Sequence, residues 1–139
     1  MNSEDFNKLV AERLTQCTRV MTAKAGEYAS DADRLHNFKK AGRMKDQDPV
    51  RALDGMWLKH RVSVDDMVER LCTDAGYVPD KALIAEKFGD NHNYLLLLEG
   101  LIEDRRSLLA FNQESQARQC DKPAGMNPDR QDDARQNQK

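Results

Sequence analysis

The sequence lacks the features on which several classes of protein depend. Its 139 residues include three cysteines, and these stand far apart, at positions 17, 72 and 120. A disulfide framework or a zinc site needs closer spacing, so we expect reduced thiols. Cys17 and Cys72 fall on apolar helical stripes, where a free cysteine packs as a small hydrophobic side chain, and we expect both in the core.

The chain also lacks a long apolar run and an excess of charge of one sign. Its longest apolar run, residues 94–98, is far below the roughly 20 residues of a membrane-spanning helix. Its acidic start has neither the basic residues nor the apolar run of a signal peptide. With 22 basic and 24 acidic residues, the formal net charge of −2 produces no strong field toward nucleic acid or anionic lipid. We therefore expect a cytoplasmic protein with no membrane or nucleic-acid partner.

The sequence motifs of several enzyme classes are missing as well. There is no glycine-rich phosphate loop, no Gly-x-Ser-x-Gly, no His-Glu-x-x-His and no Cys-x-x-Cys. These absences argue against P-loop, serine-hydrolase and zinc chemistry.

What the sequence does contain is helical periodicity. Asp48 followed by Pro49 marks a helix start, because aspartate caps the first turn and proline suits the first helical position. Ser3 and Asp80 are the expected caps of the first and last helices. The expected helices cover residues 3–25, 31–42, 49–72 and 81–111. No segment has the pattern of a strand, so we predict an all-α bundle of four to five helices.

The composition changes after Phe111. Residues 112–139 are rich in Gln, Asn, Asp and Arg and have almost no apolar side chains. Such a segment cannot bury enough apolar surface to offset its ordering entropy. We therefore predict a helical domain over residues 1–111 and a disordered polar tail over residues 112–139.

A polar stripe on the last helix is the most informative feature of the chain. At about 100° per residue, Glu86, Asp90 and Asn93 lie within about 60° of one another. The same stripe continues into Leu97 and Leu101, so it points toward the interior of the bundle. Two carboxylates there need a cation or a basic side chain to compensate their charge.

Two further polar groups interrupt the expected apolar faces. The first lies at the junction of the first two helices and comprises Glu27, Asp31, Asp33, Arg34 and Asn37. The second runs from Lys59 to Asp66: Lys59, Ser63 and Asp66 share a face beside the apolar stripe of the third helix, and His60 lies within that stripe. Ordinary structural explanations exist for all of them: a solvated helix junction, a core histidine, and an internal ion pair of Lys59 or Arg34 with Asp90.

Taken together, the three groups favour a phosphate site. Mg²⁺ prefers carboxylate oxygens and water, and it binds through one or two carboxylates plus the phosphates of the substrate. Basic side chains neutralise the leaving pyrophosphate, and a carboxylate can orient the attacking water.

The residues also resemble a known family. Glu86-Lys-Phe-Gly-Asp90 is similar to the Glu-Glu-Leu-Gly-Asp segment of the MazG-like all-α nucleoside-triphosphate pyrophosphohydrolases. More closely, the chain is similar to small bacteriophage proteins related to that superfamily, over roughly residues 20–105. The pattern that carries this likeness is Glu27-Tyr-Ala, Asp33-Arg-Leu-His-Asn37-Phe38, Lys59-His60-Arg-Val-Ser63-Val-Asp-Asp66 and Glu86-Lys-Phe-Gly-Asp90-Asn-His-Asn93-Tyr94.

The resemblance implies a Mg²⁺-dependent enzyme that cleaves a nucleoside triphosphate into a monophosphate and pyrophosphate. Asp90 matches the metal-binding aspartate and Glu86 the first glutamate of the segment. Lys87 and Ser30 stand where the family has further glutamates. The expected metal ligands are Glu27, Asp33, Glu86 and Asp90, the expected catalytic residues are Glu27, Glu86, Asp90 and Lys59, and the expected substrate contacts are Arg34, Asn37, Lys59, His60 and Asn93.

Three interpretations remain open at this point. The first is a Mg²⁺-dependent pyrophosphohydrolase of a nucleoside triphosphate or modified nucleotide, acting in phage nucleotide metabolism in the host cytoplasm. The second is a non-catalytic module that uses the same pocket to bind a nucleotide, for example to counter host defence. The third is a structural helical protein whose polar stripes are ion pairs. Because the superfamily commonly builds its site between subunits, we expect a homodimer or homotetramer.

Overall fold

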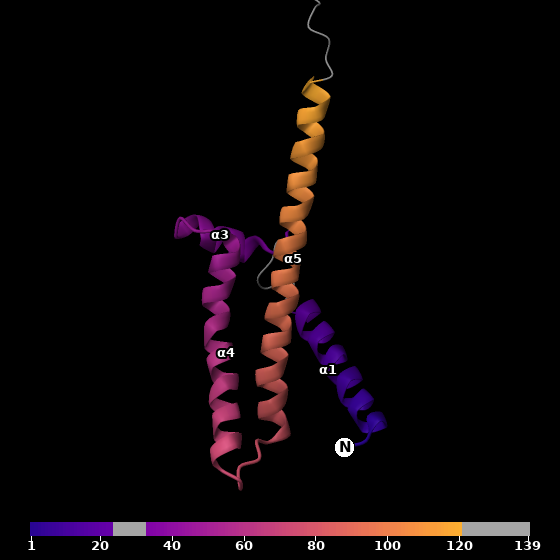
Figure 1. The fold of residues 1–139 in the computed structure, drawn as a ribbon, viewed down its shortest axis with the longest axis vertical. Helices are drawn as coiled ribbons and strands as arrows, with labels where there is room; N and C mark the ends of the chain where they lie inside the picture. Colours follow the sequence, from indigo (N-terminus) through magenta and orange to yellow (C-terminus); the bar gives the residue numbers. More distant parts are fainter. Residues whose placement is uncertain (24–32, 121–139) are drawn as a thin grey trace, which may run out of the picture. The chain divides into compact units, whose positions relative to one another are not determined.

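The computed structural model describes residues 1–23 and 33–120. All of the secondary structure elements in these ranges are helices: α1 (Ser3–Ala23), α3 (His36–Met44), α4 (Pro49–Thr73) and α5 (Lys81–Cys120) (Figure 1). No strand occurs in the described part of the chain, so the all-α prediction is confirmed. The predicted helix end at Ala25 and the predicted site residues Glu27 and Asp31 lie outside the described residues.

Two of the three predicted helix starts are confirmed. The Asp48 side chain accepts a hydrogen bond from the backbone N–H of Val50 at 2.8 Å, and Pro49 opens α4. The Asp80 carboxylate accepts from the backbone N–H of Leu83 at 2.8 Å, at the start of α5. The third prediction was wrong by one residue, because Asn2 rather than Ser3 caps α1. Both residue types can accept this bond, and the sequence does not decide between neighbours.

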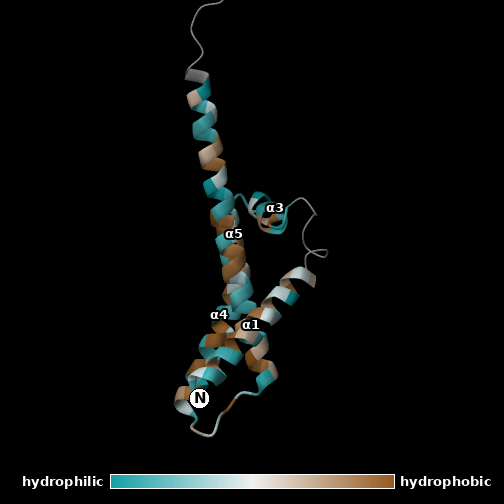
Figure 2. Ribbon diagram, turned by 90° about the vertical axis from the view of Figure 1, so that its right-hand side faces the viewer, coloured by the Kyte–Doolittle hydropathy of each residue, from teal (hydrophilic) through white to brown (hydrophobic). Residues whose placement is uncertain are grey.

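The chain forms two compact units, residues 1–105 and 106–139. In the first unit, α4 and the first part of α5 lie side by side and run in opposite directions (Figure 1). The core cluster consists of Phe38 from α3, Leu53 from α4 and Leu101 from α5. Hydrophobic residues also gather along the middle of α5, brown in Figure 2, and Leu97 and Leu98 pack against the core. Phe38 and Leu101 therefore point inward, as their periodicity predicts.

In the second unit, the described residues continue α5 to Cys120 rather than ending it at Phe111. Residues 112–120, which we assigned to a disordered tail, are thus helical, whereas residues 121–139 lie outside the described residues. Arg118 pairs with Glu114 one turn earlier, at 3.8 Å. Glutamine, glutamate and arginine are good helix formers, so a segment without apolar periodicity can still continue a helix.

Two further findings bear on the predictions for the chain as a whole. Cys17 is buried, as predicted, but Cys72, in the last turn of α4, is exposed. The core position predicted for Cys72 was therefore wrong. Among the described helices, none combines the length and the apolar character that crossing a bilayer requires.

The corner between α3 and α4 depends on a glycine. A Cβ atom on Gly42 would lie 2.7 Å from the carbonyl oxygen of Gln47 and 3.2 Å from the nitrogen of Pro49. Both are backbone atoms, and the Gln47 N–H also donates to the carbonyl oxygen of Gly42 at 2.9 Å. A side chain at residue 42 would push α3 away from the start of α4. Gly55, within α4, has open space at the same position.

We therefore expect opposite effects from alanine at these two glycines. Gly42→Ala should lower the free energy of unfolding by about 1–3 kcal/mol, because the backbone must move to admit the methyl group. Gly55→Ala should raise it by up to about 1 kcal/mol, since alanine is the better helix former. Urea denaturation followed by circular dichroism measures both, and equal effects of the two variants would contradict the tight corner.

Candidate functional site

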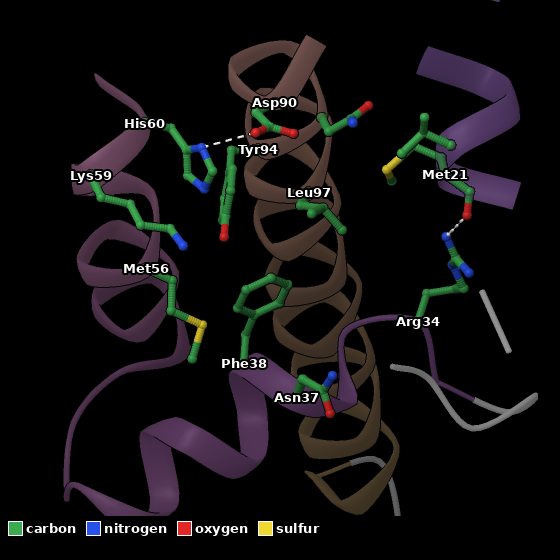
Figure 3. Close-up of a pocket in the computed structure, with 12 residues that line it drawn as sticks. Met21, Arg34, Asn37, Phe38, Met56, Lys59, His60, Asp90, Tyr94 and Leu97 are labelled. Carbon is green, nitrogen blue, oxygen red and sulfur yellow. Dashed lines mark hydrogen bonds and ion pairs between the residues drawn. The ribbon is translucent and has the colours of Figure 1, made fainter. Parts of the chain in front are cut away.

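A cavity of about 420 Å³ lies within the first unit, and it contains most of the predicted site. Figure 3 shows its walls, which come from the end of α1, the residues around the start of α3, the middle of α4 and the middle of α5. Among its lining residues are six of the predicted site residues: Arg34, Asn37, Lys59, His60, Asp90 and Asn93. The rest of the wall is apolar or aromatic and consists of Val20, Met21, Phe38, Met56, Tyr94 and Leu97.

A histidine–aspartate pair forms the end of the cavity between α4 and α5. His60 Nδ1 lies 3.0 Å from Asp90 Oδ2, and the two side chains are 19% and 32% exposed. Because a carboxylate accepts hydrogen bonds, Nδ1 is the donor and the second ring nitrogen faces the cavity (Figure 3). Asp90 is therefore partnered by His60, and not by Lys59 or Arg34 as the structural interpretation supposed.

The aromatic ring of Tyr94 packs against the imidazole of this pair. Its centroid lies 5.1 Å from that of His60, and its other neighbour is Trp57, stacked at 6.2 Å with an interplanar angle of 6°. Burial raises the pKa of the Tyr94 hydroxyl, and the negative charge of Asp90 raises this pKa further. The tyrosine therefore stays protonated at neutral pH and offers the cavity a neutral aromatic wall.

Asn91 connects the two helices behind this wall. Its side-chain oxygen accepts from the indole N–H of Trp57 at 2.7 Å. Its amide nitrogen donates to the carbonyl oxygen of His60 at 3.1 Å and to that of Lys87 at 2.9 Å. The sequence analysis missed this residue because it followed the stripe through Asp90. The signal was its spacing from Tyr94, three residues on and therefore on the same face of α5.

Two cationic side chains face the cavity from different elements, Lys59 from α4 and Arg34 from the segment before α3. They lie on opposite sides of the cavity in Figure 3. The Arg34 guanidinium donates to the carbonyl oxygen of Met21 at 2.6 Å, which ties it to the end of α1. Within the described ranges, Lys59 makes no hydrogen bond or ion pair. Among the described lining residues, Asp90 is the one carboxylate and it already binds His60, so these residues carry more positive than negative charge.

Two of the predicted acidic residues do not line this cavity. Glu86 pairs with Lys87 at 3.0 Å and its side chain is 60% exposed. It lines a neighbouring cavity of about 450 Å³, whose wall also includes Asp90 and Asn93. Asp33 pairs instead with Lys39 at 3.2 Å, and Lys39 also contacts Asp104 at 2.9 Å.

The Asp33–Lys39–Asp104 cluster fastens the start of α3 to α5. The backbone N–H of Leu35 donates to Asp33 and holds the pKa of that carboxyl below its usual 3.8, and Lys39 lowers it further. The hydrogen bond to Asp104 raises the pKa of Lys39 above its usual 10.5. Folding lowers the pKa of Asp33 and raises that of Lys39, so the charged cluster stabilises the fold between about pH 3.8 and pH 10.5.

The cavity thus combines two cations, an oriented imidazole, the amides of Asn37 and Asn93, and an apolar wall. Such a site can bind an anionic ligand that also has a flat or apolar part. Within the described ranges, no group of three or more His, Cys, Asp or Glu side chains is placed to hold a metal ion. Comparison of the chain with protein-family models, curated proteins and solved structures found no match.

The cluster around Asp33 predicts how stability depends on pH. A carboxyl whose pKa is lowered by folding stabilises the protein above its unfolded pKa of 3.8, and this contribution disappears as the pH falls through the lower folded value. Asp33→Asn should therefore cost about 0.5–1 kcal/mol at pH 7, discounted for partial exposure, and almost nothing at strongly acidic pH.

Thermal melts between pH 2 and pH 8 measure this difference. Asp66→Asn, at an exposed site on α4, is the control and should follow the wild type. A destabilisation by Asp33→Asn that stayed constant across this pH range would contradict the role assigned to the carboxylate.

Proposed function

We propose that the cavity binds a nucleoside triphosphate or a modified nucleotide, and that the protein hydrolyses it to a monophosphate and pyrophosphate. The observation that carries this proposal is the placement of Arg34 and Lys59 on one cavity, where Asp90, the one carboxylate among the described lining residues, already binds His60. Cationic side chains that face a cavity without carboxylate partners favour an anionic ligand.

The remaining walls suit the rest of a nucleotide. Phe38, Met56 and Tyr94 offer apolar and aromatic surface to a base, while Asn37 and Asn93 offer amides to its polar edge or to the sugar. A volume of about 420 Å³ lies within the range of pockets that bind small molecules. In this arrangement, Lys59 and Arg34 neutralise the phosphates, and His60 presents its cavity-facing nitrogen to them or to a water molecule.

In this proposal, Asp90 and Glu86 are the ligands of Mg²⁺. These carboxylates lie one turn apart on α5 and both line the second cavity, while Asp90 also lines the first. One or two carboxylates are sufficient for Mg²⁺ that is bound mainly by phosphates, and its charge would polarise the phosphorus that water attacks. The predicted ligand Glu27 lies outside the described residues.

The alternative is a module that binds the nucleotide without cleaving it. The hydrogen bond between His60 and Asp90 favours this reading, because it commits one oxygen of the carboxylate on which Mg²⁺ binding would depend. The pairing of Glu86 with Lys87 points the same way. Both functions use the same two cations, so they differ in turnover and not in the ligand.

We also propose that the protein assembles as a homodimer or homotetramer. Many large apolar side chains of the first unit are about half exposed, including Phe6 and Leu14 on α1, Leu58 on α4 and Leu95 on α5. Association with further copies of the chain would remove these side chains from water, which stabilises an assembly. Sedimentation velocity at several concentrations should give a mass of two or four chains, and a monomer at every concentration would contradict the proposal.

The nucleotide proposal predicts the effect of removing a single cation. With Mg²⁺ and a panel of ribo- and deoxyribonucleoside triphosphates, calorimetry should detect binding, and a coupled assay should detect pyrophosphate. Lys59→Ala should weaken the affinity by tenfold or more, since a charge-assisted hydrogen bond contributes about 1.5–3 kcal/mol. Lys40→Ala, at an exposed site on α3 that does not line the cavity, should leave the affinity unchanged.

Asp90→Asn separates the two candidate functions in the same assays. A pyrophosphohydrolase should lose turnover in this variant, whereas a binding module should show no turnover even in the wild type. Wild-type protein that binds no member of the panel would refute both.

A further inference from the structure

Asn91 is a half-buried polar residue whose hydrogen bonds cross from one wall of the cavity to the other. We propose that Asn91 is a positioning residue: it fixes the register of α4 against α5 and so sets Lys59 and His60 opposite Asp90 and Tyr94. The effect of Asn91 on ligand affinity rests on the proposed nucleotide function, but its effect on the register does not. Asn91 does not line the cavity itself, so it acts through the residues that do.

The amide of Asn91 makes close to the full set of hydrogen bonds that it can make. The side-chain oxygen takes the indole N–H of Trp57, and the two hydrogens on nitrogen point to the carbonyl oxygens of His60 and Lys87. Of these, the bonds to Trp57 and His60 reach α4, and they lie one turn apart on that helix. A shift of α5 along α4 would break both bonds and leave the amide oxygen and the indole N–H, which are partly buried, without these partners.

Apolar contacts alone would not select this register. Hydrophobic burial is non-directional and discriminates only weakly between neighbouring registers, whereas the hydrogen bonds of Asn91 to Trp57 and His60 require this one. One helical turn corresponds to about 5.4 Å, which is enough to carry His60 out of reach of Asp90. The asparagine therefore excludes alternatives that the surrounding hydrophobic side chains would tolerate.

The register matters because the cavity draws on both helices. α4 supplies Met56, Lys59 and His60, and α5 supplies Asp90, Asn93, Tyr94 and Leu97. Trp57 and His60, the partners of Asn91, also contact the ring of Tyr94. A change at Asn91 should thus alter the spacing between Lys59 and the α5 wall without removing any lining side chain.

The test compares three substitutions in the full chain. Asn91→Leu keeps the approximate size and removes every hydrogen bond of the amide. Trp57→Phe removes only the indole donor and keeps a ring against Tyr94. Asn112→Leu removes an exposed amide from the same helix and is the matched control. Circular dichroism and thermal melts first establish the temperature range in which each variant is folded.

We expect Asn91→Leu to weaken nucleotide binding by about tenfold, Trp57→Phe by less, and Asn112→Leu not at all. A double-mutant cycle with Lys59→Ala decides whether Asn91 acts through the cation. If it does, Lys59→Ala costs much less affinity in the Asn91→Leu background than in the wild type. Additive losses would show a general structural effect and would overturn the inference.

A second measurement does not depend on a ligand. Nuclear Overhauser effects between the rings of His60 and Tyr94 should be present in the wild type and in Asn112→Leu, and lost in Asn91→Leu. Their persistence in Asn91→Leu would overturn the inference even if nucleotides bind. Their loss, in a protein that binds no nucleotide, would support the positioning role while the proposed function fails.

Discussion

The pairing of α4 with α5 around Tyr94 is the contact on which the rest of the structure depends. Tyr94 contacts the rings of both Trp57 and His60, so one aromatic side chain of α5 packs against two successive turns of α4. Helices α4 and α5 supply Leu53 and Leu101, and Phe38 of α3 packs with them to complete the core. Because the core is small, few other contacts could compensate if this pairing shifted. The cavity has the same origin, since its two long walls are the same two helices.

Charged side chains are arranged differently at α3 and at the cavity. At the start of α3, Lys39 has two carboxylate partners, Asp33 and Asp104, and this cluster holds α3 against α5. On the cavity side, Lys59 has no such partner among the described residues, and Asp90 is occupied by His60. In the first arrangement the charges of Lys39 and its two carboxylate partners compensate one another, so a structural role is sufficient to account for it. The second leaves Lys59 facing the cavity without a carboxylate partner among the described residues, which is why it and not the Lys39 cluster is the candidate site.

How much of this the sequence predicts depends on the range of the interaction. The caps at Asp48 and Asp80 are local, since each contacts a backbone N–H two or three residues away, and both were predicted. Periodicity on α4 and α5 also brought Lys59, Asp90 and Asn93 to the cavity, because it fixes the face of a helix, although Glu86 of the same α5 stripe lines the neighbouring cavity. The partner of Asp90 was not predictable, since His60 and Lys59 are neighbours, and only the rotation of α4 decides which of them reaches it. The end of α5 was missed because hydrophobic periodicity does not report a helix held by propensity alone.

The same distinction between the buried face of a helix and its register applies to Asn91. A pattern of apolar residues determines which side of a helix is buried, but it repeats every turn and so leaves the sliding coordinate open. A hydrogen-bonding side chain on that face has its partners at one axial position of the neighbouring helix, so it selects one register. The polar residues of α5 thus divide into two functions by their angle on the helix. Asp90 and Asn93 line the cavity, whereas Asn91 bonds to α4 and, as we propose, determines where Lys59 and His60 of α4 stand.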